Sequence, residues 1–148
     1  MKTMLMTPGE INYLLEGIAH TSDFESRSID LVEDWESANI GFEAIEPILR
    51  FMEEHPSIEF GTPGALVHFV ETFYRDHKDD YETKLLESVS RRPTSHTVWM
   101  LNRLINGTKI PNEKQRLVVA MTQAKQNPLV DPVALDEINR FLERLGVH

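Results

Sequence analysis

The sequence predicts an all-α protein of about eight helices, and three observations lead to this fold class. Apolar residues recur at the three- and four-residue spacing of one helical face, as Ile11, Leu14, Leu15 and Ile18 do. Residues that cap helix N-termini precede most of these apolar stripes. No segment alternates strictly between apolar and polar residues, and no β-branched run is bounded by turns, so strands are not predicted.

Three helices are expected in the first 60 residues. The segment 7–10 has the capping-box pattern, with a threonine N-cap, a proline at the first helical position and a glutamate that reaches back. Ser26 or Ser28 is expected to begin the second helix. Pro47 either kinks the third helix or begins its regular part. The residues expected to face inward on the second and third helices are Ile29, Val32, Trp35, Phe42, Ile45, Ile48, Leu49 and Met52.

Five further helices follow, each with a start signal and an apolar stripe. The start signals are Thr62-Pro63, Asp79 or Asp80, Thr94 or Ser95, Asn112 with Gln115, and Asp131-Pro132. Pro93 stops the second of these helices, and Asn106-Gly107 ends the third. The inward residues expected are Leu66, Phe69, Val70, Phe73, Tyr81, Leu85, Val89, Val98, Trp99, Leu101, Leu104, Ile105, Leu117, Val118, Met121, Leu135, Ile138, Leu142 and Leu145.

The arrangement expected for these helices is one domain, 1–148, because a length near 150 residues is typical of a single domain. Short connections make neighbouring helices antiparallel hairpins. Helix pairs begin near residues 41, 79 and 112, a spacing of roughly 35 residues that is typical of paired-helix repeats. We therefore expect an irregular HEAT-like helical repeat, with a compact helical bundle as the alternative.

The charge of the chain is concentrated near its N-terminus. The formal charge is −9, from 24 acidic and 15 basic residues. Residues 1–60 hold 13 acidic and three basic residues, whereas the rest of the chain holds 11 acidic and 12 basic residues. An acidic segment of this kind repels nucleic acid and attracts basic partners, although an acidic surface can also serve solubility alone.

Motifs for catalysis and for metal or cofactor binding are not found in the sequence. The chain has no cysteine, which excludes disulfides, thiolate zinc sites and cysteine nucleophiles. None of the six histidines has the Glu-x-x-His or paired-histidine spacing of helical metal sites. His68 near Glu71 could be a base with its orienting carboxylate, but Glu71 fits better as the helix partner of Arg75. We expect no catalytic residue, no cofactor and no metal, and hence a protein that is not an enzyme.

Composition also bears on location and on partner class. No apolar run approaches the ~20 residues that span a bilayer, and the first eight residues are too short for a secretion signal. A cytoplasmic protein without a membrane partner is expected. Basic residues that could line two helix ends are Arg91, Arg92, Lys109, Lys114 and Arg116. The overall charge is wrong for nucleic acid, which we therefore do not expect as a partner.

One segment is more distinctive than the rest of the chain. Ser90-Arg91-Arg92-Pro93-Thr94 is followed by a helix that contains Leu101-Asn102-Arg103-Leu104-Ile105-Asn106. Over residues 60–110 this pattern resembles small α-helical immunity proteins of bacterial polymorphic-toxin and contact-dependent growth-inhibition systems, of the class called immunity protein 30. The resemblance implies a non-enzymatic cytoplasmic protein that binds and neutralises one cognate toxin domain, often a nuclease. The alternative is a generic helical-repeat adaptor with another partner.

The surface expected to bind such a toxin is acidic, because a nuclease has a basic cleft that holds phosphates. Asp30, Glu33 and Asp34 are expected to point away from the inward side of the second helix. An ordinary solvated helix face would show the same pattern, and the sequence leaves both interpretations open. The partner-binding residues expected are Asp23, Glu25, Asp30, Glu33, Asp34 and Glu36.

Overall fold

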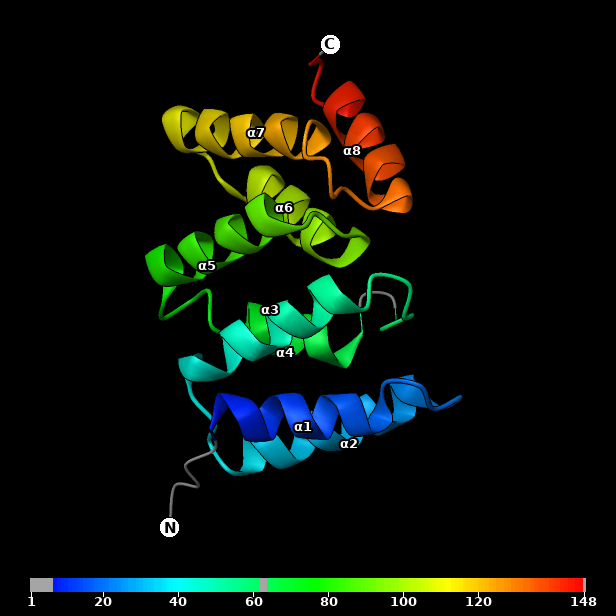
Figure 1. The fold of residues 1–148 in the computed structure, drawn as a ribbon. Helices are drawn as coiled ribbons and strands as arrows, with labels where there is room; N and C mark the ends of the chain where they lie inside the picture. The colour runs from blue at the N-terminus through cyan, green and yellow to red at the C-terminus, as the bar shows by residue number, and fades with distance from the viewer. Residues whose placement is uncertain (1–6, 62–63, 148) are drawn as a thin grey trace. The chain divides into compact units, whose positions relative to one another are not determined.

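A computed structural model describes residues 7–61 and 64–147. Within these ranges every regular element is helical, and no residue lies in a strand, so the all-α prediction is confirmed. The repeat arrangement remains a prediction. The elements are α1 (Pro8–Ile18), α2 (Phe24–Ser37), the 3-10 turn η1 (Phe42–Ala44), α3 (Ile45–Glu54), α4 (Ala65–Glu71), α5 (Lys78–Arg91), α6 (Ser95–Gly107), α7 (Pro111–Lys125) and α8 (Pro132–Arg144) (Figure 1).

The contacts between Cα atoms divide the chain into two compact units, Met1–Glu82 and Thr83–His148. The boundary falls inside α5. We describe the N-terminal unit and the C-terminal unit separately. Among the described helices, none is both long enough and apolar enough to cross a membrane.

In the N-terminal unit, α1 packs against α2 and α3, and α2 packs against α4. Three phenylalanines join the start of α2, the middle of α3 and the segment after it. The ring centroids of Phe24 and Phe60 lie 5.3 Å apart, and those of Phe51 and Phe60 lie 5.9 Å apart. Ring stacking at these distances adds to the stabilisation from burial. These rings therefore join the start of α2 to α3 in the core of this unit.

The start of α1 matches the sequence prediction. The Thr7 hydroxyl accepts a hydrogen bond from the Glu10 backbone N–H (3.2 Å), and the Glu10 carboxylate accepts one from the Thr7 N–H (3.5 Å). These two bonds are the reciprocal pair of a capping box, and the Glu10 N–H also donates to the Thr7 carbonyl (3.0 Å). Ile11 and Leu15 are fully buried, as the apolar spacing predicts.

The start of α2 differs from the prediction. The helix begins at Phe24, and Ser28 lies inside it, where its hydroxyl donates a hydrogen bond to the Glu25 carbonyl (2.8 Å). The inward face consists of Phe24, Ser28, Val32 and Trp35. Ile29 follows Ser28 by one residue, a rotation of about 100°, and is 47% exposed. The predicted inward position of Ile29 is therefore wrong.

The next helices follow the expected order with changes at their boundaries. Pro47 lies in the first turn of α3, after η1, so it begins the regular part of that helix. The predicted cap Thr62-Pro63 lies outside the described residues, and Gly64, with a positive φ of 95°, precedes α4. The helix α4 ends at Glu71 and α5 begins at Lys78, so Asp79 and Asp80 lie within the first turn of α5 rather than before it. Acidic residues at that end of a helix are favourable for its dipole.

In the C-terminal unit, α6 packs against α7 and α8, which also pack against each other. Thr94 caps α6 and Asp131 caps α8, as predicted, whereas α7 begins at Pro111 and not at Asn112. The backbone N–H of Asp131 also donates to the Pro93 carbonyl (3.1 Å), which ties the start of α8 to the turn before α6. The fully buried apolar residues of this core are Val98, Met100, Leu101, Ile105, Leu117, Met121, Ala134 and Ile138.

Both tryptophans were predicted to be buried, and this prediction is wrong for Trp99. Trp35 is 1% exposed, but Trp99 is only partly buried. The guanidinium carbon of Arg103 lies 5.0 Å from the centroid of the Trp99 ring, one helical turn further along α6. A cation over an indole face is an attractive arrangement that keeps one side of the ring near solvent.

Candidate functional site

All six acidic residues predicted to bind a partner are exposed, and all lie on α2 or at its N-cap position. They form two rows, because residues three and four apart share one side of a helix. Glu25, Glu33 and Glu36 form the first row, together with the exposed Ile29. Asp23, Asp30 and Asp34 form the second row, together with Arg27. We call these the glutamate row and the aspartate row.

The negative charge of the aspartate row is partly compensated by Arg27, which lies in the same row. The Arg27 Nε lies 2.7 Å from the Asp23 Oδ1, and both side chains are about half exposed. The hydrogen bond from Arg27 holds the pKa of Asp23 below its usual value. Among the described residues, no lysine or arginine forms an ion pair with any of the other five acids. The uncompensated negative charge is therefore strongest along the glutamate row.

A hollow of about 230 Å³ lies beside the glutamate row, between α2 and α4. Val32 and Phe69 are its buried apolar residues, whereas Ile29 and His68 are exposed. The residues that line it are Ile29, Val32, Glu33, Glu36, Ala65, His68, Phe69 and Thr72. Sites for small molecules typically have volumes of ~300–1,000 Å³, so this hollow is smaller than a typical small-molecule site.

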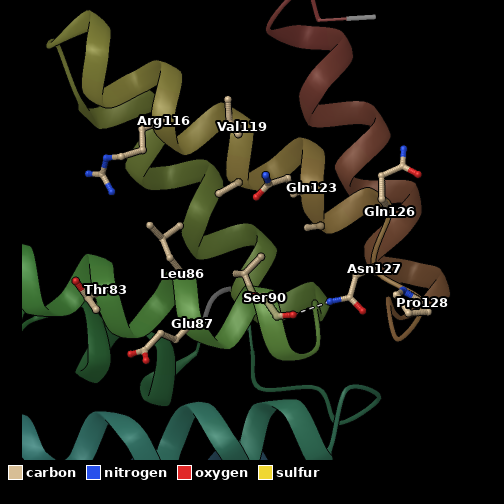
Figure 2. A pocket seen from close by; sticks show the side chains of 13 residues that line it. Thr83, Leu86, Glu87, Ser90, Arg116, Val119, Gln123, Gln126, Asn127 and Pro128 are labelled. Carbon is tan, nitrogen blue, oxygen red and sulfur yellow. Dashed lines mark hydrogen bonds between the residues drawn. The ribbon is translucent and has the colours of Figure 1, made fainter.

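A second and larger hollow, of about 690 Å³, lies in the C-terminal unit. Figure 2 shows Leu86 on α5 pointing toward α7, whose Arg116, Val119 and Gln123 also line the hollow. Val119 is 47% exposed. At one end the Asn127 side chain bonds to the Ser90 carbonyl. This hollow therefore has apolar walls and a polar rim.

The larger hollow is lined by 13 residues, of which Thr83 and Ser90 carry hydroxyl groups. None of these residues is a histidine or a cysteine, and Glu87 is the one carboxylate among them, on α5 with Thr83 and Ser90. Of the basic residues considered for nucleic acid, Arg116 lines it. Sequence reasoning missed this hollow, because it forms between helices about 30 residues apart in the chain. An exposed Val119 on an otherwise polar face of α7 was the available signal.

Comparison with protein-family models, with curated proteins and with solved structures finds no match to this chain.

Proposed function

We propose that this chain is an immunity protein that acts in the cytoplasm by binding a basic toxin domain through α2, without catalysis. The observation that carries the proposal is the glutamate row, where three exposed carboxylates lie beside an exposed isoleucine and a hollow. A solvated helix face does not need an exposed isoleucine among its acids. A face that docks on a protein combines charged contacts with apolar contacts.

The hollow suits a lysine or arginine side chain of the partner. The apolar stem of such a side chain would lie on Ile29 and Phe69, and its charged end would meet Glu33 and Glu36 at the rim. Phosphates of nucleic acid or anionic lipids would be repelled by the same carboxylates. A basic protein is thus the partner that this surface favours.

Long-range attraction would guide the encounter. Acidic and basic patches steer association, and the effect weakens as salt shortens the Debye length to ~8 Å at physiological ionic strength. The charge imbalance of residues 1–60 places most of the field on the N-terminal unit. Rapid binding is useful for a protein that must reach a toxin before the toxin reaches its target.

The test is co-expression with the C-terminal domain encoded by the reading frame directly upstream of this chain's gene. Two variants carry the same change of charge on the same helix: Glu33→Lys with Glu36→Lys, and Asp30→Lys with Asp34→Lys. Both pairs are exposed, so both variants should fold. Wild type should restore growth, the glutamate-row variant should fail, and the aspartate-row variant should retain most of its protection.

Two outcomes would count against the proposal. The first is an upstream domain whose toxicity the wild-type chain does not relieve. The second is protection by both variants equal to that of wild type. A general charge effect is checked by reversing Asp136, Glu137 and Glu143 on α8, which lie outside the N-terminal unit. That variant should protect as wild type does.

A further inference from the structure

Three metal-ligating side chains meet in the N-terminal unit, at the C-terminal ends of α1 and α3. Glu16 lies in the last turn of α1, Glu54 is the last residue of α3, and His55 is the C-cap of α3. One ligand atom from each of the three lies within 4.8 Å of the other two. The His55 Nε2 is 2.8 Å from the Glu16 Oε1. The motif search missed this group because 39 residues separate Glu16 from His55.

The imidazole of His55 is held in place by its surroundings. Its ring centroid lies 4.5 Å from that of Phe51, one turn earlier on α3. The His55 side chain is only 15% exposed, whereas that of Glu16 is 38% exposed. The ring is thus packed against Phe51 on one side and presents Nε2 to the Glu16 carboxylate. A ligand fixed in this way loses little conformational freedom when it binds an ion.

The electrostatics of this group favour a cation. Helix C-termini carry partial negative charge, and neither α1 nor α3 has a basic residue in its last turn. Two carboxylates converge at these ends. Among the described residues, no lysine or arginine pairs with Glu16 or Glu54. A divalent cation would offset the mutual repulsion of the carboxylates and the partial charges of both helix ends.

The three ligands indicate which cation this group would bind. One imidazole with two carboxylates is a nitrogen and oxygen set that suits Zn²⁺ better than Mg²⁺ or Ca²⁺, which prefer oxygen alone. Bonds of about 2.0–2.1 Å in a tetrahedral site place neighbouring ligand atoms about 3.4 Å apart. The three ligand atoms lie within 4.8 Å of one another, so the side chains would close on the ion by a change of their torsion angles. His20 lies close by, with its ring centroid 5.7 Å from that of His55.

We propose that Glu16, Glu54 and His55 bind a divalent transition-metal ion, with Zn²⁺ as the preferred ion. The site is independent of the acidic surface of α2. Its effect would be to join the C-terminal ends of α1 and α3, and so to stabilise the N-terminal unit.

The experiment is isothermal titration calorimetry of the metal-free full chain with ZnCl₂, using protein without a polyhistidine tag. Wild type should bind one Zn²⁺ in a saturable manner. His55→Gln and Glu54→Gln should each weaken binding about tenfold or more, because each removes a direct ligand. The matched control is His77→Gln, which removes an exposed histidine that stacks on Phe42 and belongs to no group of metal-ligating side chains among the described residues. His77→Gln should bind Zn²⁺ as wild type does.

A second measurement distinguishes the loss of a Zn²⁺ ligand from a loss of folding. Zn²⁺ should raise the Tm of wild type, and EDTA should reverse the rise, whereas the Tm of Glu54→Gln should not respond to Zn²⁺. Glu54 is exposed, so its variant should be as stable as wild type in EDTA. Two results would overturn the proposal: no saturable binding of Zn²⁺ by wild type, or binding that His55→Gln and Glu54→Gln leave unchanged.

Discussion

The side-chain nitrogen of Asn127 donates a hydrogen bond to the carbonyl oxygen of Ser90, with 2.7 Å between the two atoms. Ser90 lies in the last turn of α5, where backbone carbonyls have no helical donor. The Asn127 side-chain oxygen accepts a second bond from the Leu129 N–H (2.8 Å). One amide therefore fixes the end of α5 and the turn between α7 and α8.

Replacing Asn127 by alanine removes both of these hydrogen bonds. We expect the free energy of unfolding to fall by about 1–2 kcal/mol, since each bond contributes about 1 kcal/mol. Urea denaturation followed by circular dichroism measures the change. Asn127→Asp is the matched variant, because it keeps the acceptor for Leu129 but loses the donor to Ser90. At neutral pH it should remain less stable than wild type; wild-type stability would mean that the Ser90 bond contributes nothing.

Replacement of Leu101 by alanine tests the packing of the core of the C-terminal unit. Leu101 is 0% exposed and lies on the inward stripe of α6. Leu101→Ala should lower the free energy of unfolding by ~2–5 kcal/mol, because it removes buried apolar contacts and leaves a cavity. Leu129 is 60% exposed, so Leu129→Ala should change stability by no more than ~0.5 kcal/mol. Similar losses in the two variants would contradict this packing.

The two tryptophans should be distinguishable by fluorescence. Trp99→Phe leaves Trp35, which is 1% exposed and whose Nε1 has no hydrogen-bond partner among the described residues. Its emission should be blue-shifted and resistant to quenching by iodide. Trp35→Phe leaves Trp99, whose partly exposed ring faces Arg103. That emission should be redder and more easily quenched. Equal quenching of the two variants would contradict the difference in burial.

Local signals predicted the fold class and several helix starts. Thr7, Thr94 and Asp131 cap their helices through bonds to residues two or three positions away, so a short stretch of sequence specifies them. The start of α2 was not predicted, because Asp23 at its N-cap position makes no side-chain bond to the helix. Ile29 was predicted to face inward because it is apolar and lies three residues before Val32. Ser28, four residues before Val32, takes that inward position instead.

The candidate surfaces depended on contacts that sequence spacing does not show. The acidic residues of α2 could be predicted, since exposure follows from their charge. Their division into two rows follows from the same three- and four-residue spacing, but the exposure of Ile29 within the glutamate row could not be predicted, because Ile29 was expected to face inward. The hollow beside the glutamate row needs α4 packed on α2, and the group at Glu16 needs α1 packed on α3. Tertiary packing sets both of these arrangements.

A substitution of Ile29 tests whether the glutamate row is a docking surface or an ordinary solvated helix face. Ile29→Ser should leave the free energy of unfolding within ~0.5 kcal/mol of wild type, because the side chain is already half exposed. If the stem of a partner side chain lies on Ile29, loss of that apolar contact should raise the dissociation rate. Reversal of Glu33 and Glu36 should mainly lower the association rate, and that rate should fall with salt in wild type. Surface plasmon resonance with the purified toxin domain measures both rates. An Ile29→Ser variant with unchanged dissociation would show that the partner does not cover this row of α2.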